Sequence, residues 1–166
     1  MKAVLITGMS GTGKSSLIRE LAARGYEAVD TDYGGFSELV DVPVTEVTGI
    51  GQGRDWVWRE DRISDLLASE RQGTLFVSGC APNQGKFYPR FDYVILLTAP
   101  DEVLLERLTT RTNNPYGKQA EEQARVLQLK QTIEPLLRRA ADLEIDTSIP
   151  LVDVVSKVIR FVDQKG

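Results

Sequence analysis

The sequence contains no histidine, which excludes zinc–histidine sites, histidine-based catalytic triads and phosphohistidine chemistry. Its single cysteine, Cys80, cannot form an internal disulfide and suits a reducing compartment. No apolar run approaches the ~20 residues that a membrane-spanning helix needs. A first strand expected to begin at Ala3 leaves no room for a signal peptide. We therefore expect a cytoplasmic protein.

An excess of positive charge is also missing. The formal net charge is -4, so no global field attracts nucleic acid, and any site for an anion must be local. The hydrophobic fraction of 42% and the charged fraction of 27% are ordinary for a globular protein. The length of 166 residues predicts one domain over residues 1–166 with one sizeable core.

The strongest pattern lies near the N-terminus. Residues 3–7 form a short apolar, β-branched run, and residues 8–15 follow with the letters GMSGTGKS. Residues 16–24 then show helical spacing of apolar side chains. This strand, glycine loop and helix match the Walker A or P-loop pattern G-x-x-x-x-G-K-S/T at every specified position. A chance glycine-rich turn is the alternative, and the flanking strand and helix argue against it.

Phosphate binding requires these residue types. Gly8 and Gly13 let the backbone curl around a phosphate without a Cβ in the way. The loop amides and the helix N-terminus point donors at the phosphates, and Lys14 adds a full positive charge. The hydroxyl of Ser15 is placed to bind Mg²⁺. The predicted nucleotide-binding residues of the loop are Gly8, Met9, Ser10, Gly11, Thr12, Gly13, Lys14, Ser15 and Ser16.

Strands and helices alternate along the rest of the chain. Further strands are expected at residues 26–29, 74–78, 93–98 and 143–146, and helices at residues 56–69, from residue 101, at residues 121–140 and from residue 151. Asp55 could cap the helix that begins at residue 56, and Pro135 should kink or split the helix in which it lies. Residues 33–53 are expected to be an irregular, mobile excursion, with a short helix near residues 36–40. The alternation predicts the α/β class with a parallel sheet.

The chain resembles the small P-loop kinases of the shikimate, gluconate and adenylate kinase type. The resemblance rests on the loop, on Asp30-Thr31-Asp32 after the second strand, on residues 97–108 and on residues 145–148. More narrowly, residues 56–62 and 111–118 are similar to bacterial proteins labelled only as ATP-binding or kinase-like. The resemblance implies a three-layer fold with a five-stranded sheet in the order 2-3-1-4-5. It also implies ATP and Mg²⁺ as cofactors, an acceptor-binding region at about residues 32–62 and a short lid at about residues 107–120.

Two acidic residues lie at the carboxyl end of the second expected strand, where ligands bind in such sheets. The resemblance assigns Asp30 to Mg²⁺, together with Ser15, and assigns Asp32 to the hydroxyl of the acceptor. The third strand ends without a Walker B aspartate, which leaves this metal role to Asp30. A solvated acidic turn is the alternative for the pair.

Arg107 and Arg111 lie four residues apart on one face of a helix that leads into the expected lid. In the family, arginines of the lid close over the phosphates of ATP, which makes both candidates for nucleotide binding and Arg111 the stronger one. The catalytic set predicted in this way is Lys14, Asp32 and Arg111. A pair of surface arginines matched with nearby glutamates remains the alternative.

The acceptor is expected to lie between residues 32–62 and 79–90, which are rich in aromatic and basic side chains. Aromatic rings there could stack on a planar acceptor such as a nucleoside, although most of them could equally belong to the core. Arginines could bind an acidic group, or could be solvated at the surface. The predicted substrate-binding residues are Asp32, Tyr33, Trp58, Arg62, Gly79 and Asn83.

These residues favour a Mg²⁺- and ATP-dependent transfer of the γ-phosphoryl group to a hydroxyl of a small molecule. A nucleoside monophosphate kinase is the first alternative, and it requires at least two arginines that converge on the acceptor. A nucleotide-binding NTPase module without a small acceptor is the second. The expected partners are ATP or ADP and a small-molecule acceptor, with no nucleic acid and no membrane. The sequence names neither the acceptor nor the oligomeric state.

Overall fold

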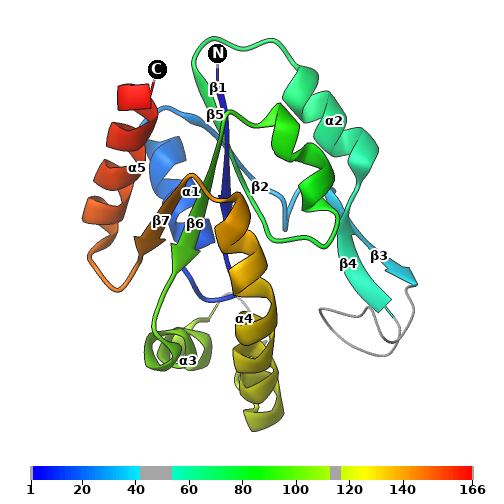
Figure 1. Ribbon diagram of the computed structural model, residues 1–166, viewed down its shortest axis with the longest axis vertical. Coiled ribbons are helices and arrows are strands. Elements are labelled where there is room, and N and C mark those ends of the chain that lie inside the picture. The colour runs from blue at the N-terminus through cyan, green and yellow to red at the C-terminus, as the bar shows by residue number, and fades with distance from the viewer. Residues whose placement is uncertain (1, 42–53, 113–116, 166) are drawn as a thin grey trace.

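A parallel sheet of five strands forms the centre of the protein (Figure 1). The computed structural model describes residues 2–41, 54–112 and 117–165. Across the sheet the order is β2-β5-β1-β6-β7, which among these five strands is the predicted order 2-3-1-4-5. The strands are β1 (Lys2–Thr7), β2 (Glu27–Asp30), β5 (Thr74–Ser78), β6 (Tyr93–Thr98) and β7 (Leu143–Asp146).

The central strands are buried on both faces because helices cover both sides of the sheet. In β1, Val4, Leu5 and Ile6 are fully buried, and Val4 stands opposite Phe76 of β5. A continuous apolar run without alternation is typical of a central parallel strand. This burial fixes the carboxyl end of β1, and with it the start of the loop that begins at Gly8.

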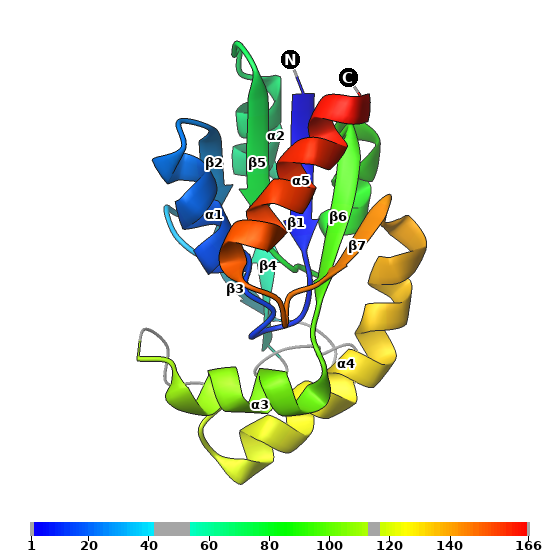
Figure 2. The ribbon, with the colours of Figure 1, turned by 90° about the vertical axis from the view of Figure 1, so that its left-hand side faces the viewer.

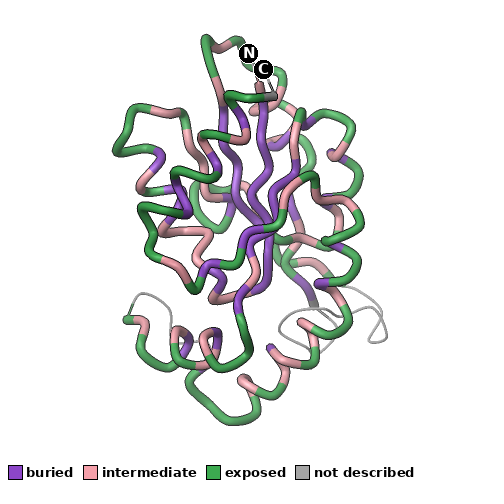
Figure 3. Tube along the Cα trace, turned by 60° about the vertical axis from the view of Figure 1, so that its left-hand side comes forward, coloured by how far each residue is buried: buried purple, intermediate pink, exposed green. Residues whose placement is uncertain are grey.

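Helices α1 (Lys14–Ala23) and α5 (Leu151–Lys165) cover one face of the sheet (Figure 2). Leu17 and Leu21 of α1 pack with Val155 and Val158 of α5 in a cluster that also contains Phe76. These residues recur at steps of three and four, as an amphipathic helix requires. The purple strands between green and pink helices in Figure 3 show the resulting layers.

The opposite face is covered by α2 (Glu60–Ala68) and by a short 3-10 helix, η2 (Gln84–Arg90). Its cluster combines Leu5 and Val77 of the sheet with Trp58, Ile63 and Phe87. The rings of Trp58 and Phe87 lie 5.9 Å apart. A hydrogen bond also connects Trp58 to the residue after β2, since its indole N–H donates to Thr31 Oγ1 at 2.9 Å.

The hairpin formed by β3 (Ser37–Asp41) and β4 (Arg54–Trp58) replaces one predicted helix and shortens another. These antiparallel strands replace the short helix expected near residues 36–40 and the first turn of the helix expected from residue 56. Asp55 is buried in β4 and caps no helix. Aromatic and β-branched residues at positions 56–58 fit a strand that pairs with β3, so the helix starts only at Glu60. Residues 42–53 of the expected excursion lie outside the described residues.

Helices α3 (Asp101–Thr110) and α4 (Ala120–Ala140) follow the sequence prediction closely. Pro135 does not split α4, which runs through it. The N-terminal half of α4 lies beneath α3, and the C-terminal half of α4 rises beside the sheet (Figure 2). Leu137 of this helix is buried, whereas Leu136 is 56% exposed.

The described helices include none that is both long and apolar enough to cross a membrane.

The two tryptophans provide a matched test of the core. We expect Trp58→Phe to destabilise the protein by about 1–3 kcal/mol, because it removes a buried hydrogen bond to Thr31 and leaves a gap beside Phe87. Trp56 is 49% exposed, so Trp56→Phe should change stability by less than about 0.5 kcal/mol. Urea unfolding followed by circular dichroism measures both, and equal losses would contradict this account of the core.

Candidate nucleotide-binding site

The P-loop joins β1 to α1 with three glycines in conformations that other residues rarely adopt. Gly8, Gly11 and Gly13 have φ values of 152°, 86° and 97°. At Gly8 a Cβ would lie 2.4 Å from the carbonyl oxygen of Leu97 in β6. The loop therefore lies against the sheet at a position where only glycine fits.

Lys14 is the first residue of α1, and its side chain reaches back over the P-loop that precedes it. Its ammonium group donates to the carbonyl oxygens of Gly8 at 2.7 Å and Met9 at 3.0 Å. Thr12 is fully buried, and its hydroxyl donates to the Met9 carbonyl at 2.7 Å. These bonds hold the loop around the N-terminal end of α1. The partial positive charge at this end of the helix favours a phosphate there.

A chain of hydrogen bonds links the loop to the end of β2. The hydroxyl of Ser15 donates to Asp30 Oδ2 at 2.7 Å. The other oxygen of Asp30 accepts from the backbone amide of Asp32 at 3.0 Å. The structure thus brings together the two acidic residues and the P-loop serine, which lie in separate segments of the sequence.

The carboxyl group of Asp32 is electrostatically perturbed. Desolvation by the surrounding protein raises the pKa of Asp32, the neighbouring Asp30 raises it further, and Lys14 acts in the opposite direction. A raised pKa makes this carboxylate a better proton acceptor near neutral pH.

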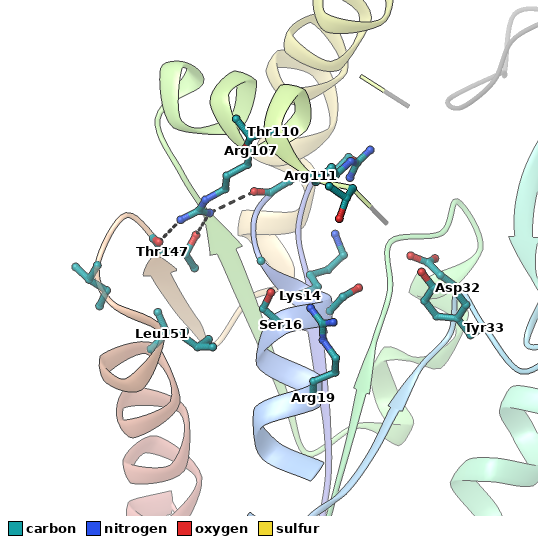
Figure 4. A pocket seen from close by; sticks show the side chains of 17 residues that line it. Lys14, Ser16, Arg19, Asp32, Tyr33, Arg107, Thr110, Arg111, Thr147 and Leu151 are labelled. Atoms are coloured by element: carbon teal, nitrogen blue, oxygen red, sulfur yellow. Dashed lines mark hydrogen bonds between the residues drawn. The ribbon is translucent and has the colours of Figure 1, made fainter. Parts of the chain in front are cut away.

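Arg107 of α3 ties three segments together. Its guanidinium donates to the carbonyl oxygen of Gly11 at 3.2 Å and to Thr147 Oγ1 at 2.9 Å, and also to the backbone carbonyl of Thr147 (Figure 4). The hydroxyl of Thr147 donates in turn to the carbonyl oxygen of Thr12 at 2.7 Å. The P-loop, α3 and the turn after β7 therefore share one network of hydrogen bonds.

These elements enclose a cavity of about 630 Å³, shown in Figure 4. Ten of the predicted site residues line it: Ser10, Gly11, Gly13, Lys14, Ser15, Ser16, Asp32, Tyr33, Arg107 and Arg111. Seven residues outside the predicted site set complete the lining, of which Thr110 and Thr112 belong to the expected lid: Arg19, Thr110, Thr112, Thr147, Ile149, Leu151 and Val154.

The missed residues carried different signals in the sequence. Arg19 follows Ser15 by one helical turn, which was readable from the spacing. Thr147 lies in a segment that supported the family resemblance, but its bond to Thr12 depends on the tertiary structure. Ile149, Leu151 and Val154 supply an apolar wall that composition alone does not mark.

The structure corrects the substrate role predicted for Trp58. This residue is 2% exposed and lies in the core, so its ring is not available to stack on an acceptor. At Gly79 a Cβ would lie 2.2 Å from Thr31 Oγ1 and 3.0 Å from the Trp58 ring, so packing against protein atoms already requires this glycine. Asn83 bonds to both the N–H and the C=O of Trp58, at 3.0 and 2.9 Å. None of these three residues lines the cavity.

Arg62 is also engaged by the protein. It donates to the carbonyl oxygen of Gly34 at 3.2 Å, and its guanidinium lies 5.2 Å from the centre of the Phe36 ring. These contacts hold the turn that follows Asp32. Arg62 does not line the cavity.

Cys80 follows β5 beside the loop. Cys80 is exposed as a residue, but desolvation of its thiol by nearby protein atoms raises the pKa of the thiol, and the Lys14 ammonium partly offsets this effect. A thiol that stays protonated at neutral pH is a poor nucleophile.

Oxygen ligands suitable for Mg²⁺ are present at one place. The Ser15 hydroxyl and the Asp30 carboxylate lie within hydrogen-bond distance of each other at the mouth of the P-loop. Mg²⁺ usually takes one or two such protein ligands and completes its octahedron with phosphate oxygens and water. The residues present therefore fit a magnesium ion that arrives with a nucleotide.

The fold and the loop define a P-loop protein with a nucleotide-sized cavity at the carboxyl edge of its sheet. Residues 4–128 match the sequence profile of the family described as AAA domain, and the chain belongs to this family. A solved structure of shikimate kinase from Acinetobacter baumannii, in complex with shikimate, superposes with a TM-score of 0.65 at 20% identity, covering 99% of this chain and 94% of that one. The predicted P-loop kinase fold is confirmed.

Two relatives differ in length. A nucleotide-binding protein of Limosilactobacillus reuteri is 31% identical over 156 residues, which make up 89% of this chain and 48% of that protein. The chain thus spans about half the length of this relative. A shikimate kinase of Thermodesulfovibrio yellowstonii is 27% identical over 165 residues, 96% of this chain and 94% of that protein.

The perturbed carboxyl of Asp32 predicts a pH effect on stability. Because its pKa is raised in the folded protein, ionised Asp32 costs stability as the pH rises through that pKa. We expect Asp32→Asn to raise the thermal midpoint at pH 7, with the gain disappearing below about pH 4, where Asp32 is protonated in both states. Thermal unfolding at both pH values checks this, and a gain that persists at low pH would exclude charge as its cause.

Proposed function

We propose that the protein is a Mg²⁺- and ATP-dependent phosphotransferase that moves the γ-phosphoryl group to a hydroxyl of a small molecule. The observation that carries this proposal is a single cavity that contains both a P-loop and the carboxylate of Asp32, joined by the Ser15–Asp30 contact. Phosphoryl transfer needs phosphate binding, metal ligands and a group that orients the nucleophile, and little other covalent chemistry.

Each role follows from position. Lys14 and the loop amides bind the β- and γ-phosphates, and Ser15 and Asp30 hold Mg²⁺. The metal ion supplies positive charge that offsets the charge of the phosphates. Asp32 accepts the hydrogen bond of the acceptor hydroxyl and takes up its proton. Arg111, at the C-terminal end of α3, stabilises negative charge on the transferring group from the expected lid.

The two lid arginines have different roles in this proposal. The bonds from Arg107 to Gly11 and Thr147 support a role in fixing the nucleotide-binding walls. Arg111 lines the same cavity one helical turn later. Residues 113–116 of the expected lid lie outside the described residues.

A hydroxyl acceptor fits better than a nucleoside monophosphate. The latter requires arginines that converge on a phosphate, but three candidates contact separate protein groups. Arg59 lies 3.6 Å from Asp61, Arg62 binds the carbonyl of Gly34, and Arg90 donates to Ser64 Oγ at 2.9 Å. The side chain of Arg54 lies outside the description.

A nucleotide-binding module without a small acceptor is the second candidate. The name of the Limosilactobacillus relative, nucleotide-binding protein, supports it, as does the greater length of that relative. This candidate predicts nucleotide binding without transfer to any alcohol, whereas a phosphotransferase forms ADP in step with a phosphorylated product.

Asp32→Asn separates transfer from binding. We expect this variant to bind Mg²⁺·ATP as the wild type does but to lose about 10²–10⁴-fold in kcat, because it lacks the proton acceptor. Isothermal titration measures binding, and an ADP-release assay over nucleosides, sugars and other alcohols measures transfer. Lys14→Met should instead lose nucleotide binding. Equal turnover by Asp32→Asn and the wild type would remove Asp32 from the reaction.

Asp30→Asn tests the metal role. We expect ATP turnover by this variant to need a several-fold higher Mg²⁺ concentration for half-saturation, because one anionic ligand is lost. Asp65 is an exposed acid of α2 outside the cavity, and Asp65→Asn serves as the control. The same Mg²⁺ dependence in Asp30→Asn and in this control would argue against Asp30 as a metal ligand.

A further inference from the structure

Arg19 is a positively charged residue that lines the cavity and has no role in the reaction proposed above. It belongs to α1 and lines the cavity together with Asp32 and Tyr33. Figure 4 shows its side chain running along α1 toward the P-loop end of the helix, with Asp32 and Tyr33 across the opening. This course agrees with the general tilt of helical side chains toward the N-terminus.

The face of α1 that carries Arg19 is the acceptor side. Arg19 follows Ser15 by four residues, so both lie on one face of the helix. Ser15 points to the end of β2, because its hydroxyl lies 2.7 Å from Asp30. Arg19 is therefore placed on the side where β2 ends and where Asp32 would orient the acceptor.

Arg19 differs in its contacts from Arg24 at the end of the same helix and from the arginines held near the predicted acceptor region. Among the described residues it has no hydrogen bond or ion pair with a protein group. Arg24, at the end of the same helix, pairs with Glu20 at 3.1 Å. In the region predicted to bind the acceptor, Arg62 and Arg90 are held by Gly34 and Ser64. The guanidinium of Arg19 is available to a ligand in the cavity.

We propose that Arg19 binds an acidic group of the acceptor, which would therefore be an alcohol that also carries a carboxylate or a phosphate. This inference rests on the proposed function. Asp30 and Asp32 make the acceptor side negative, so an anionic acceptor requires a cation close to them. A guanidinium matches carboxylate and phosphate with two parallel donors.

The nucleotide does not require Arg19, because its phosphates have other partners. Its phosphates have the loop amides, Lys14 and the N-terminal end of α1, with Arg111 from the opposite wall. Arg19 lies one helical turn beyond Ser15, across the opening from Tyr33, which is 60% exposed and offers a ring and a hydroxyl to the same ligand. Arg19 and Tyr33 together form the anchoring part of the acceptor site.

Titration of inorganic phosphate into the protein saturated with Mg²⁺ and AMP-PNP tests the proposal, because the bound nucleotide analogue blocks the P-loop. We expect the loaded wild type to bind phosphate and Arg19→Met to bind it at least about tenfold more weakly, since a charge-assisted bond is lost. Arg24→Met, on the same helix but outside the cavity, should bind phosphate as the wild type does. The affinity for AMP-PNP should be unchanged in all three.

Three results would overturn the proposal. The loaded wild type could fail to bind phosphate, Arg19→Met could bind it equally well, or Arg19→Met could lose affinity for AMP-PNP, which would assign Arg19 to the nucleotide. The proposed transfer reaction is judged separately. If the wild type binds AMP-PNP but phosphorylates no alcohol, the phosphotransferase fails whatever the phosphate titration shows.

A second measurement uses matched acceptors. In the ADP-release assay, shikimate is compared with its methyl ester and a nucleoside monophosphate with its nucleoside, so that each pair differs by one acidic group. In whichever pair the wild type phosphorylates, we expect the acidic compound to have the lower KM. Arg19→Met should remove this difference in KM between the two compounds, while KM for ATP stays the same. A neutral member preferred by the wild type and turned over equally by Arg19→Met would overturn the proposal.

Discussion

The hydrogen bond between Ser15 and Asp30, 2.7 Å long, joins the two halves of the site. Ser15 lies in the first turn of α1, directly after the loop that follows the central strand β1, whereas Asp30 ends the edge strand β2, and β5 lies between β1 and β2. The contact exists because parallel strands present their carboxyl ends at one edge of the sheet. Phosphate binding and the acidic pair therefore meet only because β1, β5 and β2 lie in this order.

The opposite wall depends on Arg107. Its bonds to Gly11 and Thr147 connect α3 to the P-loop and to the turn before α5, and Thr147 binds Thr12 in the same network. The position of α3 relative to the P-loop is thus fixed by hydrogen bonds.

The proposed acceptor side differs from the P-loop side, because most of its side chains already contact other protein groups. Trp58 and Asn83 brace the hairpin of β3 and β4 against the sheet, and Arg62 holds the turn after Asp32. This bracing positions Asp32 and Tyr33 at the cavity while keeping most nearby cations occupied. Arg19 enters from α1, on the other side of the opening, and so the proposed acceptor site draws on the same helix as the P-loop.

The sequence by itself determined the class of fold, the P-loop, the acidic pair and most helices, because these depend on local patterns: apolar runs, helical spacing and glycine positions. It could not determine which aromatic and basic residues reach the cavity. Trp58 and Trp56 carry the same side chain two residues apart, yet one is 2% and the other 49% exposed. Only the pairing of β4 with β3 and the contact of Trp58 with Thr31 decide this. Burial and partnership depend on residues far away in the chain, and so the bond from Thr147 to Thr12 became visible only in the tertiary structure.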